Sequence, residues 1–180
     1  MALRNILSEQ DPLLSKTCRP VTEFNERLHT LLDDMHETLL DSNGVGLAAP
    51  QVGVLRRAFL VLETNVEEGE EEFIVEILNP EIVETEGDQY GPEGCLSVPN
   101  LFGLVHRPSR VKVRGQDRFG QPMEYEGFDL TARALVHEND HLDGHLFVER
   151  ADKLLTPEEL QAYYAENGED EADGEEAAEE

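Results

Sequence analysis

The sequence has little of three things that would each point to a particular class of protein. Its two cysteines, Cys18 and Cys95, are too few for a disulfide framework in 180 residues, which fits a reducing compartment. No stretch approaches the roughly 20 apolar residues of a membrane-spanning helix, and residues 1–5 lack the long apolar run of a secretion signal. We therefore expect a cytoplasmic protein that does not span a membrane.

Basic residues are also scarce. The chain has 14 Lys and Arg against 40 Asp and Glu, which gives a formal net charge of -26. Because Lys and Arg supply most of the attraction to nucleic acids and anionic lipids, we expect no direct binding to either.

Length and charge together predict the domain organisation. A chain of this length without a visible repeat fits a single domain, which we place over residues 1–155. Residues 156–180 contain many acidic residues and no Lys or Arg. They are expected to form a short helix that starts at Thr156, followed from Gly168 by an acidic tail that is disordered by composition.

The pattern His-Glu-x-x-His, which begins at His137, is the most informative feature of the chain. On a helix, residues four apart lie one turn from each other on the same face, so His137 and His141 can bind one metal ion. Glu138 then lies beside the open side of that metal. Apolar residues at helical spacing from Leu130 onward, and the glycine at Gly144, predict a buried helix over this stretch.

The same pattern arises by chance in many chains, so it needs a third ligand to support it. Catalytic metal sites of this kind use three protein ligands and leave a fourth position for water. Cys95 lies in the turn-rich segment GPEGCLSVP, residues 91–99. A lone cysteine is most often a small buried hydrophobe, but one thiolate and two imidazoles would complete a tetrahedral site with an open corner.

A third unusual stretch is GVGLAAPQ, residues 44–51. It is too rich in small residues for an ordinary helix and too apolar for an ordinary loop. Its glycines would let the backbone come close to a ligand, and the alternative is a tight turn before a strand. The spacing does not match a phosphate-binding loop, and Gln51 is the polar group of interest.

The remaining pattern predicts the fold class. We expect a helix from Thr22 to about Asp41, on which His29 and His36 are surface residues, and we give Cys18 no chemical role. Short strands are expected over residues 58–62, 73–78 and 81–84, and a hairpin over residues 110–114 and 123–128. Short strands before a buried helix predict an α+β domain whose sheets surround that helix.

The three stretches, in this order and spacing, resemble the signature motifs of the peptide deformylase family, and the match extends from about Leu3 to Arg150. The resemblance implies an α+β fold with antiparallel β-sheets around the central buried helix. It implies removal of the formyl group from the N-terminal formylmethionine of newly made polypeptides, with residues 1–155 as the catalytic domain. It also implies one divalent metal ion, natively Fe2+, which Zn2+, Ni2+ or Co2+ can replace.

The resemblance also implies a role for each matching residue. The metal ligands would be Cys95, His137 and His141, and Glu138 would be the acid-base residue. The side chain of Gln51 and the backbone N–H of Leu96 would stabilise the developing oxyanion, as their positions in the family motifs imply.

Assignments for the substrate are based on the same resemblance. Gly46 would pair with the substrate backbone as an added strand, and the methionine side chain needs an apolar pocket. Candidates for that pocket are Val45, Leu130 and Ala134. An ion pair between Asp140 and Arg107 behind the metal is expected from the family pattern.

The chain departs from the family pattern at two places. Val136 stands where family members usually carry Gln, so any hydrogen bond made there is in doubt, although the metal ligands are untouched. The acidic tail is the second departure, since members with a basic C-terminal helix could dock on ribosomal RNA, whereas this tail would be repelled.

Two other functions compete with this interpretation. A His-Glu-x-x-His metalloprotease would take its third ligand downstream, where Asp143, His145 and Glu149 are available. The signature around Cys95 argues against it. A non-enzymatic acidic binding module with a structural metal would need a fourth protein ligand, and no second cysteine motif supplies one. The sequence does not identify the native metal, since affinity and cellular supply favour different ions.

Overall fold

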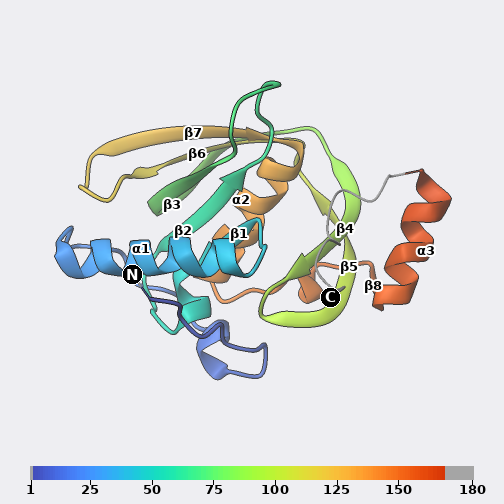
Figure 1. The fold of residues 1–180 in the computed structure, drawn as a ribbon, viewed down its shortest axis with the longest axis horizontal. Coiled ribbons are helices and arrows are strands. Elements are labelled where there is room, and N and C mark those ends of the chain that lie inside the picture. Colours follow the sequence, from blue (N-terminus) through green and yellow to red (C-terminus); the bar gives the residue numbers. More distant parts are fainter. Residues whose placement is uncertain (1, 169–180) are drawn as a thin grey trace, which may run out of the picture.

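The computed structural model describes residues 2–168 (Figure 1). The predicted acidic tail therefore lies almost wholly outside the described residues. The described helices are α1 Glu26–Asp41, α2 Asp129–Leu142 and α3 Pro157–Asn167, with short 3-10 helices η1 Pro12–Ser15, η2 Ala49–Val52 and η3 Phe147–Glu149. The strands are β1 Gly46–Ala48, β2 Ala58–Glu63, β3 Phe73–Glu86, β4 Gln89–Cys95, β5 Val98–Arg107, β6 Arg110–Gln116, β7 Pro122–Phe128 and β8 Lys153–Leu155.

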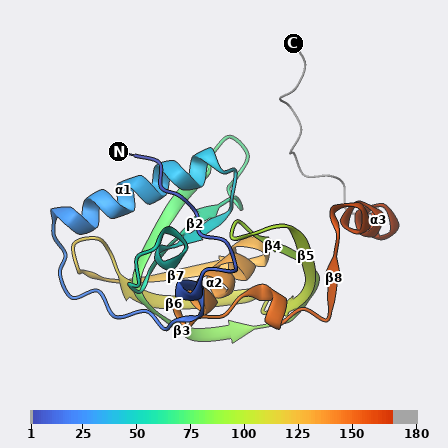
Figure 2. The same cartoon turned by 90° about the horizontal axis from the view of Figure 1, so that it is seen from below.

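The strands form two antiparallel sheets around α2. The larger sheet has the order β1-β2-β3-β6-β7, and the smaller has the order β4-β5-β8. Helix α2 packs against β1, β2, β6 and β7 of the larger sheet and against β5 of the smaller one (Figures 1 and 2). The predicted fold class, α+β with antiparallel sheets around the helix, is confirmed.

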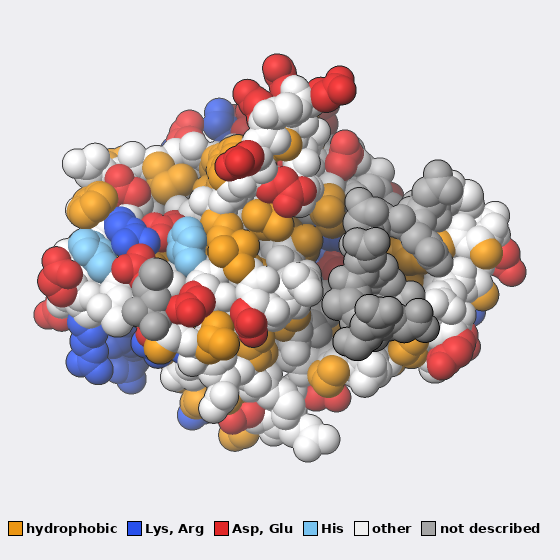
Figure 3. All heavy atoms as spheres, viewed as in Figure 1, with side chains coloured by type: hydrophobic (Ala, Val, Ile, Leu, Met, Phe, Trp, Pro, Cys, Tyr) orange, Lys and Arg blue, Asp and Glu red, His pale blue; other side chains and the backbone are white. Residues whose placement is uncertain are grey.

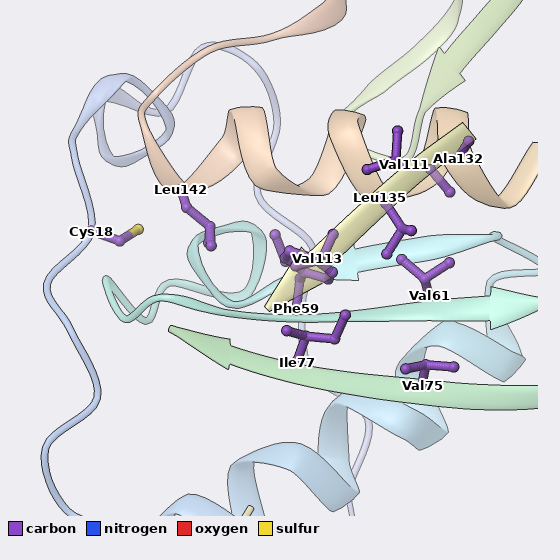
Figure 4. Close-up of a cluster of buried hydrophobic side chains, with 12 residues drawn as sticks. Cys18, Phe59, Val61, Val75, Ile77, Val111, Val113, Ala132, Leu135 and Leu142 are labelled. Carbon is purple, nitrogen blue, oxygen red and sulfur yellow. The ribbon is translucent and has the colours of Figure 1, made fainter. Parts of the chain in front are cut away.

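Strand β2 separates two hydrophobic clusters. Successive side chains of a strand point to opposite faces, so Phe59 and Val61 face α2 whereas Ala58 and Leu60 face α1. On the α2 side, Leu135 packs into the first cluster, shown in Figure 4. The apolar stripe of α1 fills the second cluster with Leu28, Leu31, Leu32, Met35 and Leu39. Burial on both faces explains why the sequence of β2 is almost continuously apolar.

Several boundaries differ from the prediction. Helix α1 begins at Glu26 because Asn25, and not Thr22, caps it through a hydrogen bond from the Leu28 backbone N–H at 3.1 Å. The two strands predicted between 73 and 84 are one strand, β3, with an irregularity between Leu78 and Glu81. There Asn79 adopts φ 49, which Asn tolerates better than most residues.

The three residues to which we gave no chemical role are buried or partly buried. Cys18 lies in the first hydrophobic cluster, and burial raises the pKa of its thiol to about 11. His29 and His36 are half-buried, and Nε2 of His36 lies 2.8 Å from a carboxylate oxygen of Glu76. Both histidines remain partly exposed at the surface, as predicted, and each ring nitrogen Nε2 has one polar partner, the backbone oxygen of Arg118 for His29 and Glu76 for His36.

Helix α3 lies at the side of the molecule and has no buried residue (Figure 2). It starts as predicted, since Thr156 and Glu159 cap its first turn reciprocally. Acidic side chains are spread over the face in Figure 3, while most of the blue Lys and Arg side chains lie toward its left edge, away from α3. Within the described residues, no helix combines the length and the apolar character that a membrane crossing requires.

Candidate active site

Helix α2 places His137 and His141 on one face, one turn apart. Their Nε2 atoms lie 3.2 Å from each other. Cys95, at the end of β4, brings its Sγ to 3.4 Å from Nε2 of His141. The ligand atoms of these three residues all lie within 4.8 Å of one another, and no fourth His, Cys, Asp or Glu of residues 2–168 joins the group.

These distances match what a tetrahedral ion requires. Metal–nitrogen bonds of about 2.1 Å and metal–sulfur bonds of about 2.3 Å place two nitrogen ligands about 3.4 Å apart, and a nitrogen and a sulfur about 3.6 Å apart. The pairs above are within about 0.2 Å of those values. Burial lowers the pKa of His141 to about 3, which keeps its imidazole in the neutral form that binds metals. The three residues therefore fit one divalent ion without rearrangement.

Glu138 lies beside this group in a buried position. A Cβ added to Gly46 would meet Oε1 of Glu138 at 2.3 Å, so the absence of a side chain on β1 gives the carboxylate its place. Its other oxygen, Oε2, has no hydrogen-bond partner among the described residues. Burial raises the pKa of Glu138 to about 7. A carboxyl of that kind can accept and return a proton near neutral pH.

Gln51, in η2, is held with its amide nitrogen toward the cysteine. Its Oε1 accepts a hydrogen bond from the Ala48 backbone N–H at 2.9 Å, which fixes the orientation of the amide. Nε2 then donates to Oγ of Ser97 at 3.1 Å and lies 3.6 Å from Sγ of Cys95. Leu96 follows Cys95 directly in the turn between β4 and β5. Both Gln51 and Leu96 line the cavity beside Glu138.

A buried network behind His137 was missed by sequence reasoning. Nδ1 of His137 donates to Oε1 of Glu93, a residue of the same motif as Cys95. Glu93 also accepts from Nη2 of Arg107 at 2.7 Å and from Nη1 of Arg133 at 2.9 Å. Burial alone would raise the pKa of Glu93, but hydrogen bonds from His137 and Arg107 hold that pKa well below its usual range. Glu93 was visible in the motif, but its partners lie far away in the sequence.

The expected ion pair between Arg107 and Asp140 is present. Nη1 of Arg107 lies 2.8 Å from Oδ2 of Asp140, and Arg150 contacts the same carboxylate through Nε at 2.8 Å. Val136, in place of the usual Gln, packs partly buried against the hydrophobic cluster around α2. An apolar contact therefore replaces any polar one at that position.

The residues named for the substrate surround a cavity of about 410 Å³ beside Glu138. Strand β1 pairs with β2 only, so its other edge is open within the described chain. The cavity is lined by the predicted residues Val45, Gly46, Leu130 and Ala134, and also by Gln51, Cys95, Leu96, His137 and Glu138. The structure thus brings all predicted site residues except the buried His141 around one cavity.

The downstream residues that a metalloprotease could use have other partners. Asp143 pairs with Arg57, with 2.9 Å between Oδ1 and Nη1. His145 pairs with Glu149, with 2.9 Å between Nδ1 and Oε2, and both side chains are exposed. None of the three lies in the group formed by Cys95 and the two histidines.

Comparisons with known proteins agree with this geometry. The family model described as polypeptide deformylase matches residues 3–156. The peptide deformylase of Caldanaerobacter subterraneus subsp. tengcongensis is 52% identical over 161 residues, which cover 89% of this chain and 97% of that protein.

Solved structures give the same result. A peptide deformylase from Legionella pneumophila is 40% identical, with a TM-score of 0.75 and coverage of 93% of this chain and 99% of the other. The Met-Ala-Ser-bound class I type b peptide deformylase from Acinetobacter baumannii is 36% identical, with a TM-score of 0.75 and coverage of 83% and 98%. The chain therefore belongs to the polypeptide deformylase family, metal-dependent enzymes that remove the formyl group from the N-terminal formylmethionine of new polypeptides.

Proposed function

We propose that this chain performs the deformylase reaction with Cys95, His137 and His141 as the ligands of one divalent ion and Glu138 as the acid-base residue. The observation that carries the proposal is the convergence of one thiol and two imidazole nitrogens at tetrahedral spacing beside a buried carboxylate. When bound, the ion lowers the pKa of water and polarises the formyl carbonyl.

The protein groups perform the remaining steps. Glu138 takes a proton from the attacking water and later delivers one to the leaving amine, so that formate and a free N-terminus are released. Nε2 of Gln51 and the backbone N–H of Leu96 donate hydrogen bonds to the oxygen that becomes negative in the transition state. The amide of Gln51 is held by hydrogen bonds with the Ala48 backbone N–H and the Ser97 hydroxyl, and a fixed donor needs little reorganisation during the reaction.

The substrate is expected to bind along β1. Its backbone would pair with the open edge at Gly46, and its first side chain would enter the cavity between Val45, Leu130 and Ala134. The related Acinetobacter baumannii enzyme has been solved with Met-Ala-Ser, a peptide that begins with methionine. We extend this substrate class, formylmethionyl nascent peptides, to the present chain.

The catalytic domain is proposed to end near residue 155. Strand β8 is part of the smaller sheet, whereas α3 buries none of its residues. We place the reaction in the cytoplasm, where new polypeptides carry the formyl group. The charge of -26 supports the expectation of no direct nucleic-acid binding.

The native metal is proposed to be Fe2+, with Zn2+, Ni2+ or Co2+ as functional substitutes. A donor set of one thiolate and two imidazoles suits all of these ions, so the ligands alone do not select among them. Metal analysis of protein purified without oxygen identifies the ion that the cell supplies. Iron near one per chain is the expected result, and zinc at that level under the same conditions would contradict it.

One assay separates this function from the competing ones. The metal-loaded protein should release formate from formyl-Met-Ala-Ser and leave unformylated peptides intact. A metalloprotease would cleave the unformylated peptide, and a binding module with a structural metal would do neither. Release that is unchanged after Glu138→Gln would reject the assigned mechanism.

A further inference from the structure

The wall of the substrate cavity contains a charged side chain where an apolar one was expected. Arg133 precedes His137 by one turn of α2, is 7% exposed and lines the cavity with Ala134 and Leu130. Its Nη1 donates to Oε2 of Glu93 at 2.9 Å. Both Nη atoms also lie 3.2 Å from the backbone oxygen of Val105. The guanidinium is therefore fixed in position by the protein.

These contacts leave part of the guanidinium unused. An arginine has five N–H donors, and only Glu93 and Val105 accept from Arg133 within the described chain. The contacts involve the two Nη atoms, so the Nε N–H and one Nη2 N–H remain without a protein acceptor in residues 2–168. Unused donors of a fixed cation can bind an acceptor on a ligand.

Gly91 leaves one side of this guanidinium uncovered. It lies on β4 directly before Pro92 and Glu93, which line the cavity. A Cβ built on Gly91 would meet one atom within 4 Å, Nη2 of Arg133 at 3.8 Å. This position of the strand therefore has no side chain that covers Nη2.

We propose that Gly91 and Arg133 form a polar end of the pocket for the first substrate side chain. This polar end would bind a neutral oxygen atom of the substrate, such as the oxygen of methionine sulfoxide. The proposal depends on the assignment of this cavity to the first side chain. A sulfoxide oxygen buried without a partner is costly, whereas an N–H of Arg133 can donate to it. A carboxylate is disfavoured at the same place because the negative charge of Glu93, 2.9 Å from Nη1 of Arg133, would repel it.

The chain would therefore deformylate peptides whose first methionine has been oxidised. The test compares kcat/KM for formate release from formyl-Met-sulfoxide-Ala-Ser and formyl-norleucine-Ala-Ser, with the same metal-loaded protein. The first substrate carries the acceptor oxygen and the second has an apolar chain of similar length. The kcat/KM for the sulfoxide peptide should be within about tenfold of that for the norleucine peptide. One charge-assisted hydrogen bond from Arg133 offsets much of the cost of burying the sulfoxide oxygen. A sulfoxide value lower by more than that overturns the proposal.

A pair of isosteric variants tests the role of Gly91. Gly91→Val covers Nη2 with methyl groups and should lower the ratio of sulfoxide to norleucine kcat/KM at least about tenfold. Gly91→Thr has the same shape but keeps a hydroxyl that can accept from Arg133 and donate to the substrate, so the ratio should fall less. An unchanged ratio in Gly91→Val, or equal falls in both variants, overturns the proposal.

The design separates this proposal from the proposed function. The ratio is taken within one preparation, so a general loss of activity or metal cancels. Thermal unfolding checks that each variant is folded, and Gly91→Ala, whose Cβ fits at 3.8 Å, replaces Gly91→Val if the latter does not fold. Absence of formate release from formyl-Met-Ala-Ser in the parent protein would reject the proposed function itself.

Discussion

Nδ1 of His137 donates a hydrogen bond to Oε1 of Glu93, which leaves Nε2 as the ring nitrogen that faces His141. Because the pKa of Glu93 is held well below its usual range, Glu93 is an acceptor at all ordinary pH values and fixes the tautomer of His137. A fixed tautomer keeps the lone pair of Nε2 toward the ion that the site is proposed to hold.

Glu93→Gln should therefore weaken metal binding while leaving all three ligands in place. Loss of such a supporting partner typically costs 10- to 100-fold in metal affinity, and we expect about that range here. Competition with a chelator of known affinity measures it. Glu124→Gln, which changes an exposed carboxylate paired with Arg114, is the control and should leave the affinity unchanged. Equal affinities for the two variants would contradict the role given to Glu93.

Cys95→Ala should reduce metal retention more than Glu93→Gln, because it removes a ligand and not only a support. A site with two imidazoles and no thiolate holds borderline metals more weakly. Metal content after dialysis against chelator should fall well below one per chain. The other cysteine gives a matched control, since Cys18→Ala lies in the hydrophobic cluster and should keep the metal. Full retention by Cys95→Ala would show that another group binds the ion.

The sequence predicted the local parts of this site and missed the non-local ones. His137 and His141 are related by helix geometry alone, and Cys95 lies in a recognisable short motif. Arg107 contacts Glu93 only because β4 and β5 form a hairpin, which the turn-rich sequence did not reveal. Arg133 was not considered for the pocket wall because a charged residue seldom lines an apolar site.

In the fold, too, the local features were predicted and the features that depend on distant contacts were not. The apolar stripe of α1 and the short apolar run of β2 were readable, because burial sets the pattern of apolar residues in each element. The start of α1 was misplaced because Thr22 and Asn25 are both good caps, and only tertiary contacts decide between them. The join of two predicted strands into β3 depends on how the Asn79 irregularity fits against β6.

Glu76 should make the stability of the protein depend on pH in the acid range. Burial would raise its pKa, but hydrogen bonds from His36 and Arg118 outweigh burial and lower the pKa to about 2. A group with a depressed pKa in the folded state stabilises fully above its unfolded value of 4.5, and that stabilisation is lost as the pH falls toward 2. The contribution is at most about 3 kcal/mol.

The measurement compares urea unfolding of the metal-free parent and Glu76→Gln at several pH values. The variant should be less stable at pH 7, and its deficit should shrink as the pH is lowered from about 5 to about 3. Metal-free protein is used for both, so that loss of metal in acid does not contribute. If the difference in unfolding free energy between parent and variant is the same at pH 5 and pH 3, Glu76 is not the titrating group.

The acidic tail should be dispensable for chemistry. A chain that ends near Asn167 keeps every candidate ligand and pocket residue, and α3 itself buries no residue. Formate release per enzyme should stay nearly unchanged, because every residue assigned to the metal or the pocket precedes Asn167. A large loss of turnover with the same thermal unfolding would reject this view of the tail.

Glu138→Gln separates proton transfer from metal binding, because the two tasks are assigned to adjacent residues of α2. The change preserves the size of the side chain and leaves Cys95, His137 and His141 in place, but removes the group that takes a proton from water and returns one to the amine. General acid-base catalysis is typically worth ~10² to 10⁴-fold, and one residue here serves two steps, so we expect a loss at or above the upper end. Metal content should remain near one per chain, since the group of candidate ligands among the described residues consists of Cys95, His137 and His141 and does not include Glu138. Formate release and metal analysis on the same preparation give both numbers, and a variant that keeps most of its activity would show that another group carries the proton.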